Sequence, residues 1–127
     1  MEKQTKKYDI TTVDGFKEFL YNSIDIRTGE LIGGGFPYAG KTFSMSANAQ
    51  SNLLGVYSAR DLLAYPFGWN VKDDSETYQI ADATEMANFF MTALGFKKAI
   101  QDSGTVLKAQ VTACTTIGEL EAIEDNR

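Results

Sequence analysis

The segment from residue 83 to 113 constrains the fold more than any other part of the chain. Its large apolar residues recur at the spacing of one helical stripe, while its charged residues fall mostly off that stripe. Asp82, followed three residues later by Glu85, is a capping-box signature at the start of the segment. Gly95 and Gly104 each cost about 1 kcal/mol relative to alanine, so we expect a bend or break near Gly104. The expected stripe comprises Met86, Phe89, Phe90, Ala93, Phe96, Ile100, Leu107 and Val111.

Two pairs of alternating segments predict antiparallel β-hairpins. Apolar residues alternate over 36–38 and again over 43–45, which predicts a hairpin that turns at Ala39 and Gly40, with Gly40 supplying a positive φ. The same alternation over 67–71 and 78–80, on either side of a polar stretch, predicts another hairpin with Trp69 as its core anchor.

The remaining elements are expected to be short. Residues 24–32 place apolar pairs on either side of a turn-like Arg-Thr-Gly, which predicts short strands around a turn. Ser46 or Ser44 can cap a helix over residues 47–63 that ends before Pro66. Its core-facing residues are expected to be Leu53, Leu54, Tyr57 and Leu62. Thr116 and Glu119 repeat the capping-box signature before a brief final helix.

The N-terminal segment has two possible roles. After a polar lead-in, Asp14 can cap a short helix that carries Phe16, Phe19 and Leu20 on one stripe. This stripe either packs into the core or forms a protein interface with a neighbouring subunit. We therefore expect an N-terminal arm and short helix over residues 1–23 and one compact domain over 24–127. The fold class is α+β, with short antiparallel hairpins packed on the long C-terminal helix and one or two shorter helices.

Composition narrows the class of protein. The chain has 127 residues, 43% of them hydrophobic, which is enough for a modest core. Its formal net charge of -5 and the lack of a basic stripe argue against a nucleic-acid partner. No run approaches the roughly 20 apolar residues that span a bilayer, and the polar N-terminus does not resemble a secretory signal. We expect a protein that neither inserts into membranes nor is exported.

Residues 35–42, GFPYAGKT, fit the spelling of a phosphate-binding loop, with Gly35, Gly40, Lys41 and Thr42 at the motif positions. A working loop follows a buried strand and opens directly into a helix, whose amides hold the phosphates. Here glycines precede the motif, and the residues after it alternate with a period of two. We therefore interpret the motif as a hairpin tip and reject these residues as a phosphate site.

Other catalytic patterns are weaker still. The chain contains no histidine and a single cysteine, Cys114, which is expected to be a small buried hydrophobe. Asp73, Asp74 and Glu76 lack the spacing of a calcium-binding loop and are expected at a solvated hairpin tip. The other carboxylate pairings, at 82 and 85 and at 119, 121 and 124, are explained by helix capping and a charged helix face. We predict no enzyme activity, no catalytic or metal-binding residues and no cofactor.

Several segments together resemble a known family. GFPYAGKTFSMSANAQSNLLG at 35–55, YPFGWNVKDD at 65–74, KKAI at 97–100 and TIGELEAI at 116–123 are similar to a small domain with no established activity. That domain recurs in proteins encoded near the tail and tail-fibre genes of tailed bacteriophages, and the likeness covers residues 24–124.

The resemblance implies a virion role in the tail region for a protein made in the host bacterial cytoplasm. The expected function is that of an adaptor or decoration protein, since the chain lacks the repetitive shaft of a full tail fibre. Its expected partners are other phage tail proteins and further copies of itself. An alternative is a tail-fibre assembly chaperone that is absent from the mature particle. A small nucleotide-binding protein that uses the phosphate-loop spelling is a third interpretation.

Overall fold

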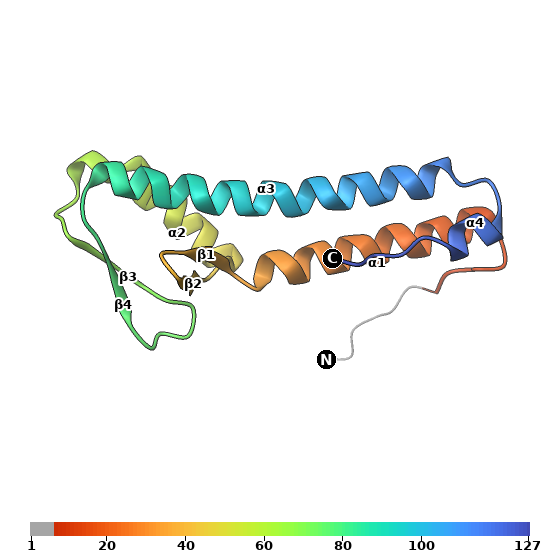
Figure 1. Ribbon diagram of the computed structural model, residues 1–127, viewed down its shortest axis with the longest axis horizontal. Helices are drawn as coiled ribbons and strands as arrows, with labels where there is room; N and C mark the ends of the chain where they lie inside the picture. The colour runs from red at the N-terminus through yellow and green to blue at the C-terminus, as the bar shows by residue number, and fades with distance from the viewer. Residues whose placement is uncertain (1–6) are drawn as a thin grey trace. The chain divides into compact units, whose positions relative to one another are not determined.

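The computed structural model describes residues 7–127 and has a mixed α+β fold, as predicted (Figure 1). The elements in chain order are α1 (Val13–Gly33), β1 (Phe36–Tyr38), β2 (Lys41–Phe43), α2 (Ala47–Ser58), the 3₁₀ helix η1 (Arg60–Leu62), β3 (Phe67–Asn70), β4 (Thr77–Ile80), α3 (Ala83–Ala113) and α4 (Ile117–Glu121). The chain divides into two compact units. Unit 1 combines the residues up to Gly29 with Gln101–Arg127, and unit 2 is Glu30–Ile100.

Unit 2 contains both hairpins. Strands β1 and β2 pair antiparallel with Phe36 opposite Phe43, and β3 and β4 pair antiparallel with Trp69 opposite Tyr78. The backbone at the first turn is left-handed at Ala39 (φ 51°) and Gly40 (φ 74°), the conformation that a two-residue hairpin requires. Both predicted hairpins, and the turn at Ala39 and Gly40, are therefore confirmed.

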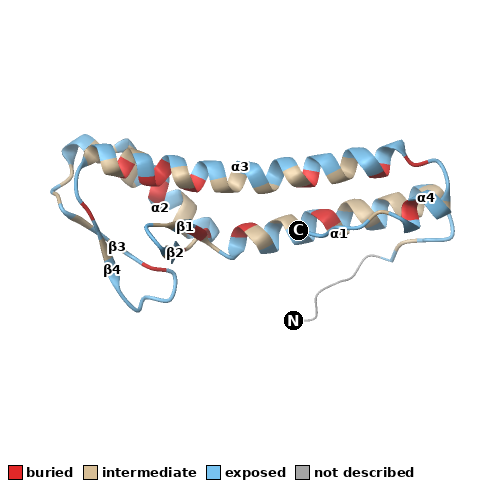
Figure 2. Ribbon diagram, viewed as in Figure 1, coloured by how far each residue is buried: buried red, intermediate tan, exposed pale blue. Residues whose placement is uncertain are grey.

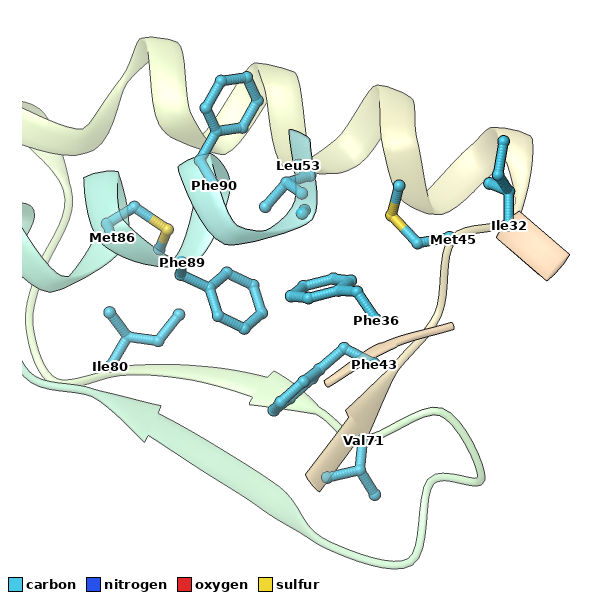
Figure 3. Close-up of a cluster of buried hydrophobic side chains, with 11 residues drawn as sticks. Ile32, Phe36, Phe43, Met45, Leu53, Val71, Ile80, Met86, Phe89 and Phe90 are labelled. Carbon is cyan, nitrogen blue, oxygen red and sulfur yellow. The ribbon is translucent and has the colours of Figure 1, made fainter. Parts of the chain in front are cut away.

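The core of unit 2 is built around Phe89 of α3. The centroid of its ring lies 4.9 Å from that of Phe43, 5.0 Å from that of Tyr38 and 5.1 Å from that of Phe36, all in edge-to-face geometry. In Figure 3 the rings of Phe36, Phe43 and Phe89 point toward one another. Such pairs contribute about 0.5–1.5 kcal/mol each beyond their buried area. Trp69 is half-buried and packs against the same cluster, as predicted for a core anchor.

Helices α2 and α3 begin at the predicted caps. The Ser46 side chain accepts a hydrogen bond from the Ala49 amide, and Asp82 Oδ1 accepts one of 2.8 Å from the Glu85 amide. Helix α3 covers the predicted residues 83–113. The residues of its predicted stripe are buried or half-buried, as the red and tan segments of Figure 2 show.

Unit 1 has a second, smaller core. Ile24, Val111, Cys114 and Leu120 are buried together, with half-buried apolar residues of α1, α3 and the C-terminal segment packed around them. The predicted capping box at the start of α4 is complete, because Thr116 and Glu119 each accept the backbone hydrogen bond of the other.

The C-terminal residue, Arg127, forms several hydrogen bonds within unit 1. The Arg127 guanidinium donates to Thr28 Oγ1 at 2.8 Å, to Ser103 Oγ at 3.1 Å and to the carbonyl of Ile24 at 3.0 Å. Asp125 pairs with the same guanidinium at 2.8 Å, which lowers the pKa of the Asp125 carboxyl. Together these contacts hold the C-terminal segment against α1 and α3.

The strands predicted over residues 24–32 are wrong, because α1 is one continuous helix through Gly33. The predicted short helix therefore extends past residue 23, and the boundary expected between an arm and a domain falls inside it. The helical conformation of this glycine-containing segment is supported by tertiary packing. Ile24 is 2% exposed in the core of unit 1, and Ile32 is buried in the core of unit 2.

Three smaller expectations also differ from the structure. Leu54 and Leu62 were expected in the core but are 56% and 88% exposed. Leu54 directly follows the buried Leu53, and successive residues of a helix point about 100° apart, so they cannot both face the same core. Helix α3 does not break at Gly104. Gly104 is buried, and a Cβ at this position would lie 2.8 Å from Thr28 Oγ1, so close packing explains the glycine.

None of the helices within residues 7–127 is both long enough and apolar enough to cross a membrane.

Candidate functional site

The phosphate-loop spelling lies on hairpin β1–β2. The predicted hairpin is present: Gly40 is in the turn and Lys41 opens strand β2, whereas a phosphate loop would begin a helix at this lysine. The backbone carbonyl of Thr42 accepts a 2.8 Å hydrogen bond from the Lys72 amide, which joins this hairpin to the turn after β3. Residues 36–38 and 41–43 are therefore paired extended strands, joined by the turn at Ala39 and Gly40.

Gly35 is required at its position by close packing. Its φ is 94°, and an added Cβ would lie 2.6 Å from the carbonyl oxygen of Phe43. A side chain here would be strained by the backbone conformation and would collide with the neighbouring strand. The first glycine of the motif thus has a structural explanation within the hairpin.

Lys41 and Thr42 border a groove of about 620 Å³ that also includes Lys72 and the turn after β3. Its lysines have partners within the chain. The Lys41 ammonium pairs with Glu76 at 2.8 Å, and Lys72 Nζ donates to the carbonyl of Gly34 at 3.2 Å. An anion would have to compete with both contacts, so the groove offers a poor phosphate site.

Two carboxylates of the turn after β3, those of Asp73 and Glu76, have a hydrogen-bond or ion-pair partner nearby. Asp73 Oδ1 accepts a 3.0 Å hydrogen bond from the Ser75 amide, and hydrogen bonds from Ser75 lower the pKa of the Asp73 carboxyl. Glu76 pairs with Lys41, and Asp74 has a left-handed φ of 58°. Among residues 7–127, no three histidine, cysteine or acidic side chains lie together in a group that could hold a metal ion.

Glu85 joins the two hairpins to the start of α3. Its Oε2 accepts hydrogen bonds from the hydroxyl of Tyr78 and, at 3.0 Å, from the hydroxyl of Tyr38, while its Oε1 accepts one of 2.7 Å from the Ala81 amide. The bond from Tyr78 is the largest cause of a lowered Glu85 pKa, and burial acts in the opposite direction. Burial, followed by the hydrogen bond to Glu85, raises the pKa of Tyr38 to about 12.

This three-residue cluster is structural in character. Its carboxylate holds donors from β1, β4 and the loop before α3, and the tyrosines keep their protons to a high pH. A general acid or base at neutral pH would need a pKa near 7, and the shifts here move both kinds of group away from that value. Asp82 is used as the helix cap.

The other candidate carboxylates and the cysteine lie at a helix cap, on the surface or in the core. Glu119 accepts hydrogen bonds from Thr115 and Thr116, of which the Thr115 amide is the largest cause of its lowered pKa. Glu121 and Glu124 are exposed. Cys114 is 8% exposed, as expected for a small buried hydrophobe, and its thiol donates to the carbonyl of Gln110.

The three predicted interface residues differ in how far they are exposed. Phe16 and Leu20 are half-buried and pack against the core of unit 1. Phe19 is 41% exposed, and its ring lies edge-on to those of Tyr8 and Phe16. A contact with another subunit at this site stays a prediction, and Phe19 is the residue of the three whose side chain is the most exposed.

A groove between α2 and α3 was not found by sequence reasoning. This α2–α3 groove has a volume of about 270 Å³, and its lining includes Leu53, Leu54, Phe90, Ala93, Leu94 and Lys97. Phe90 is buried beneath a stacked Tyr57 ring at a centroid distance of 4.1 Å. Leu94 is 44% exposed, and Met91, one turn earlier on α3, is 58% exposed. Contiguous exposed apolar side chains of this kind are typical of contact surfaces.

Comparison with known families places the chain in one of them. The family model described as "Domain of unknown function (DUF4376)" matches residues 17–125. Because this match covers most of the chain, the protein belongs to the DUF4376 family. No curated protein and no solved structure matches the chain.

Proposed function

We propose that this DUF4376 domain is a structural or accessory protein of the tail or tail-fibre region in a tailed bacteriophage, where it acts through contacts with other tail proteins. The phage context comes from the sequence resemblance over residues 24–124. In this proposal the chain is made in the host cytoplasm, performs no catalytic step, and becomes part of the virion.

The observation that carries the contact role is the α2–α3 groove. Leu54 and Leu94 border it with about half of their surfaces exposed, over a buried Phe90. Complete burial of a leucine side chain contributes about 1.5–3 kcal/mol, so a partner that covers both residues would gain a substantial part of a protein interface. The groove is concave and mostly apolar, which suits an inserted apolar side chain.

The charge near the groove indicates what kind of partner segment would bind there. Lys97 is the charged residue of the lining, and its Nζ donates a 2.6 Å hydrogen bond to Gln50 Oε1. An apolar segment with acidic residues beside it would be favoured at this rim over a basic one. The proposed partner is therefore an apolar, acidic-flanked segment of another tail protein.

Mass spectrometry of purified particles of the encoding phage tests the virion role. Stoichiometric recovery of the chain in the particles would support a structural component. Recovery in infected cells bound to a fibre protein, with none in the particles, would support the alternative of an assembly chaperone, since an open apolar groove serves that role equally well. A chain found with tail proteins in neither sample would overturn both.

The groove itself is tested by Leu94→Glu, with Leu62→Glu as the matched control. Leu62 is 88% exposed on η1 and is not among the residues that line the groove. Co-purification with tail proteins should be lost for Leu94→Glu and retained for Leu62→Glu, while thermal unfolding stays the same for both. Equal co-purification of the two variants would exclude the α2–α3 groove as the contact.

A further inference from the structure

The outer edge of β3 has backbone groups that the hairpin leaves unused. The Val71 amide donates a 3.0 Å hydrogen bond to the carbonyl of Glu76. This bond shows which opposed residues of β3 and β4 form hydrogen-bonded pairs. Hydrogen-bonded pairs alternate along an antiparallel ladder, so the next residue of β3 that bonds to β4 is Trp69. Gly68 and Asn70 therefore direct their backbone N–H and C=O groups away from β4, toward the outer edge.

This edge lies beside a groove rather than beneath another element. Side chains and backbone of α2 and β3 line a space of about 580 Å³, in which Gly68, Trp69 and Asn70 face α2 residues that include Asn52 and Gly55. We call this space the β3-edge groove. None of its eight lining residues is charged. An extended strand thus has room to approach the unused backbone groups.

We propose that a second copy of this chain pairs with β3 at this edge, in antiparallel orientation about a two-fold axis next to Trp69. In that register Gly68 of each copy lies opposite Asn70 of the other, and each such pair exchanges two backbone hydrogen bonds. The two hairpins then form one continuous sheet. The edge is its own complement, because the two residues with free backbone groups lie symmetrically on either side of Trp69.

The charge of the chain fits a second copy. Gly68 has no side chain of its own, and Thr77 Cγ2 of β4 lies 2.8 Å from where its Cβ would be, so the backbone groups of Gly68 make the proposed contact. The chain has a net charge of -5, and two copies repel each other over most orientations. An uncharged contact surface keeps that repulsion low where they meet. This dimer is independent of the proposed phage role, since it needs only the chain itself.

The test measures mass by sedimentation over a wide concentration range, with two lysine variants of the same hairpin. Asn70→Lys places a charge at the proposed contact, a change that natural proteins use to block edge pairing. Ser75→Lys places the same charge in the turn after β3, at an exposed residue that does not line the β3-edge groove. We expect a dimer for the parent and for Ser75→Lys, and a dissociation constant raised at least about tenfold for Asn70→Lys.

A second variant guards against a local effect on the hairpin. Asn52 is exposed on α2 and lines the same groove, so Asn52→Lys should weaken the dimer without touching β3. A parent chain that stays monomeric at every concentration would overturn the proposal, even if a peptide or a saccharide were found to fill the groove instead. A dimer that neither Asn70→Lys nor Asn52→Lys weakens would overturn it too, because the interface would then lie elsewhere.

Discussion

The hydroxyl of Tyr38 donates a 3.0 Å hydrogen bond to Oε2 of Glu85, which ties hairpin β1–β2 to the first turn of α3. Tyr78 of the other hairpin bonds to the same oxygen, so a single carboxylate fixes both hairpins relative to the helix on which they pack. The aromatic cluster around Phe89 lies in the same unit, and its edge-to-face geometry depends on where the hairpins are held.

Replacing Glu85 with alanine should therefore destabilise the protein. The change leaves the hydroxyls of Tyr38 and Tyr78 and the Ala81 amide without their acceptor, and a hydrogen bond to a charged group contributes a net value of about 1.5–3 kcal/mol when it is well shielded from water. Because Glu85 is partly exposed, we expect a loss of about 1–3 kcal/mol in the free energy of unfolding, measured in urea. Glu121→Ala, at an exposed position on α4, is the control and should change the value by less than about 0.5 kcal/mol.

The same carboxylate should make stability fall in acid. The pKa of Glu85 is lower in the folded chain than its ordinary value of 4.5, so the folded state favours the ionised form. This contribution is present above pH 4.5 and is lost as the pH falls through the folded-state pKa. Urea unfolding at a series of pH values should show a steeper loss below pH 4.5 for the parent than for Glu85→Gln. Parallel curves would mean that the Glu85 contacts do not depend on its charge.

How far the sequence predicts the fold depends on whether the signal is local. Caps and alternation are local, and they predicted a cap at Ser46 or Ser44, the turn at Gly40 and the start of α3. Helix α1 is different, because Thr28 and Gly29 favour a turn and are held in a helix by packing. One signal was available: Leu20 and Ile24 are four residues apart, the spacing of one helical face, and this spacing crosses residue 23.

The α2–α3 groove could not have been predicted in the same way. Its two sides lie about 40 residues apart in the chain, and tertiary contacts such as the packing of Tyr57 on Phe90 bring them together. From sequence alone, Leu53 and Leu54 are equivalent apolar residues. Which of them faces solvent depends on the side from which α3 approaches α2. The hairpin turn at Gly40 was predicted correctly, because the alternation after Lys41 is again a local signal.

A nucleotide should not bind at the hairpin of residues 35–42. Lys41 is paired with Glu76, and the backbone around it is extended. Calorimetric titration of the parent and of Lys41→Ala with ATP or GTP in the presence of Mg²⁺ should give the same small heats of dilution. A saturable signal that disappears in Lys41→Ala would show that the spelling marks a real phosphate site after all.

Leu20 and Phe19 should respond differently to truncation. Leu20 packs against the core of unit 1, so Leu20→Ala should lower the free energy of unfolding by about 2 kcal/mol, at the low end for leucine because the side chain is only half-buried. Phe19→Ala should cost less than about 1 kcal/mol, since 41% of Phe19 is already exposed. Equal losses would show that Phe19 is covered in solution, as the predicted subunit interface requires.

Gly104 and Gly95 of α3 give the clearest paired test of packing against helix propensity. Alanine is favoured over glycine by about 1 kcal/mol in a helix interior, so propensity alone predicts that both changes to alanine stabilise the protein. At Gly95 nothing lies within 4 Å of the added Cβ, and the gain should appear nearly in full. At Gly104 the Cβ would lie 2.8 Å from Thr28 Oγ1 and 3.2 Å from Arg127 Nη1.

Thr28 Oγ1 and Arg127 Nη1 cannot easily move away from an added Cβ, because the Arg127 guanidinium donates a hydrogen bond to Thr28 Oγ1 at 2.8 Å. Gly104→Ala should therefore destabilise the chain, by about 1–3 kcal/mol for overpacking, while Gly95→Ala raises the free energy of unfolding. Thermal and urea unfolding of the two single variants measure the difference directly. If both variants were stabilised alike, the close approach of α1 to Gly104 would be absent in solution, and the contacts of Arg127 with Thr28 and Ser103 would have to be reconsidered together with it.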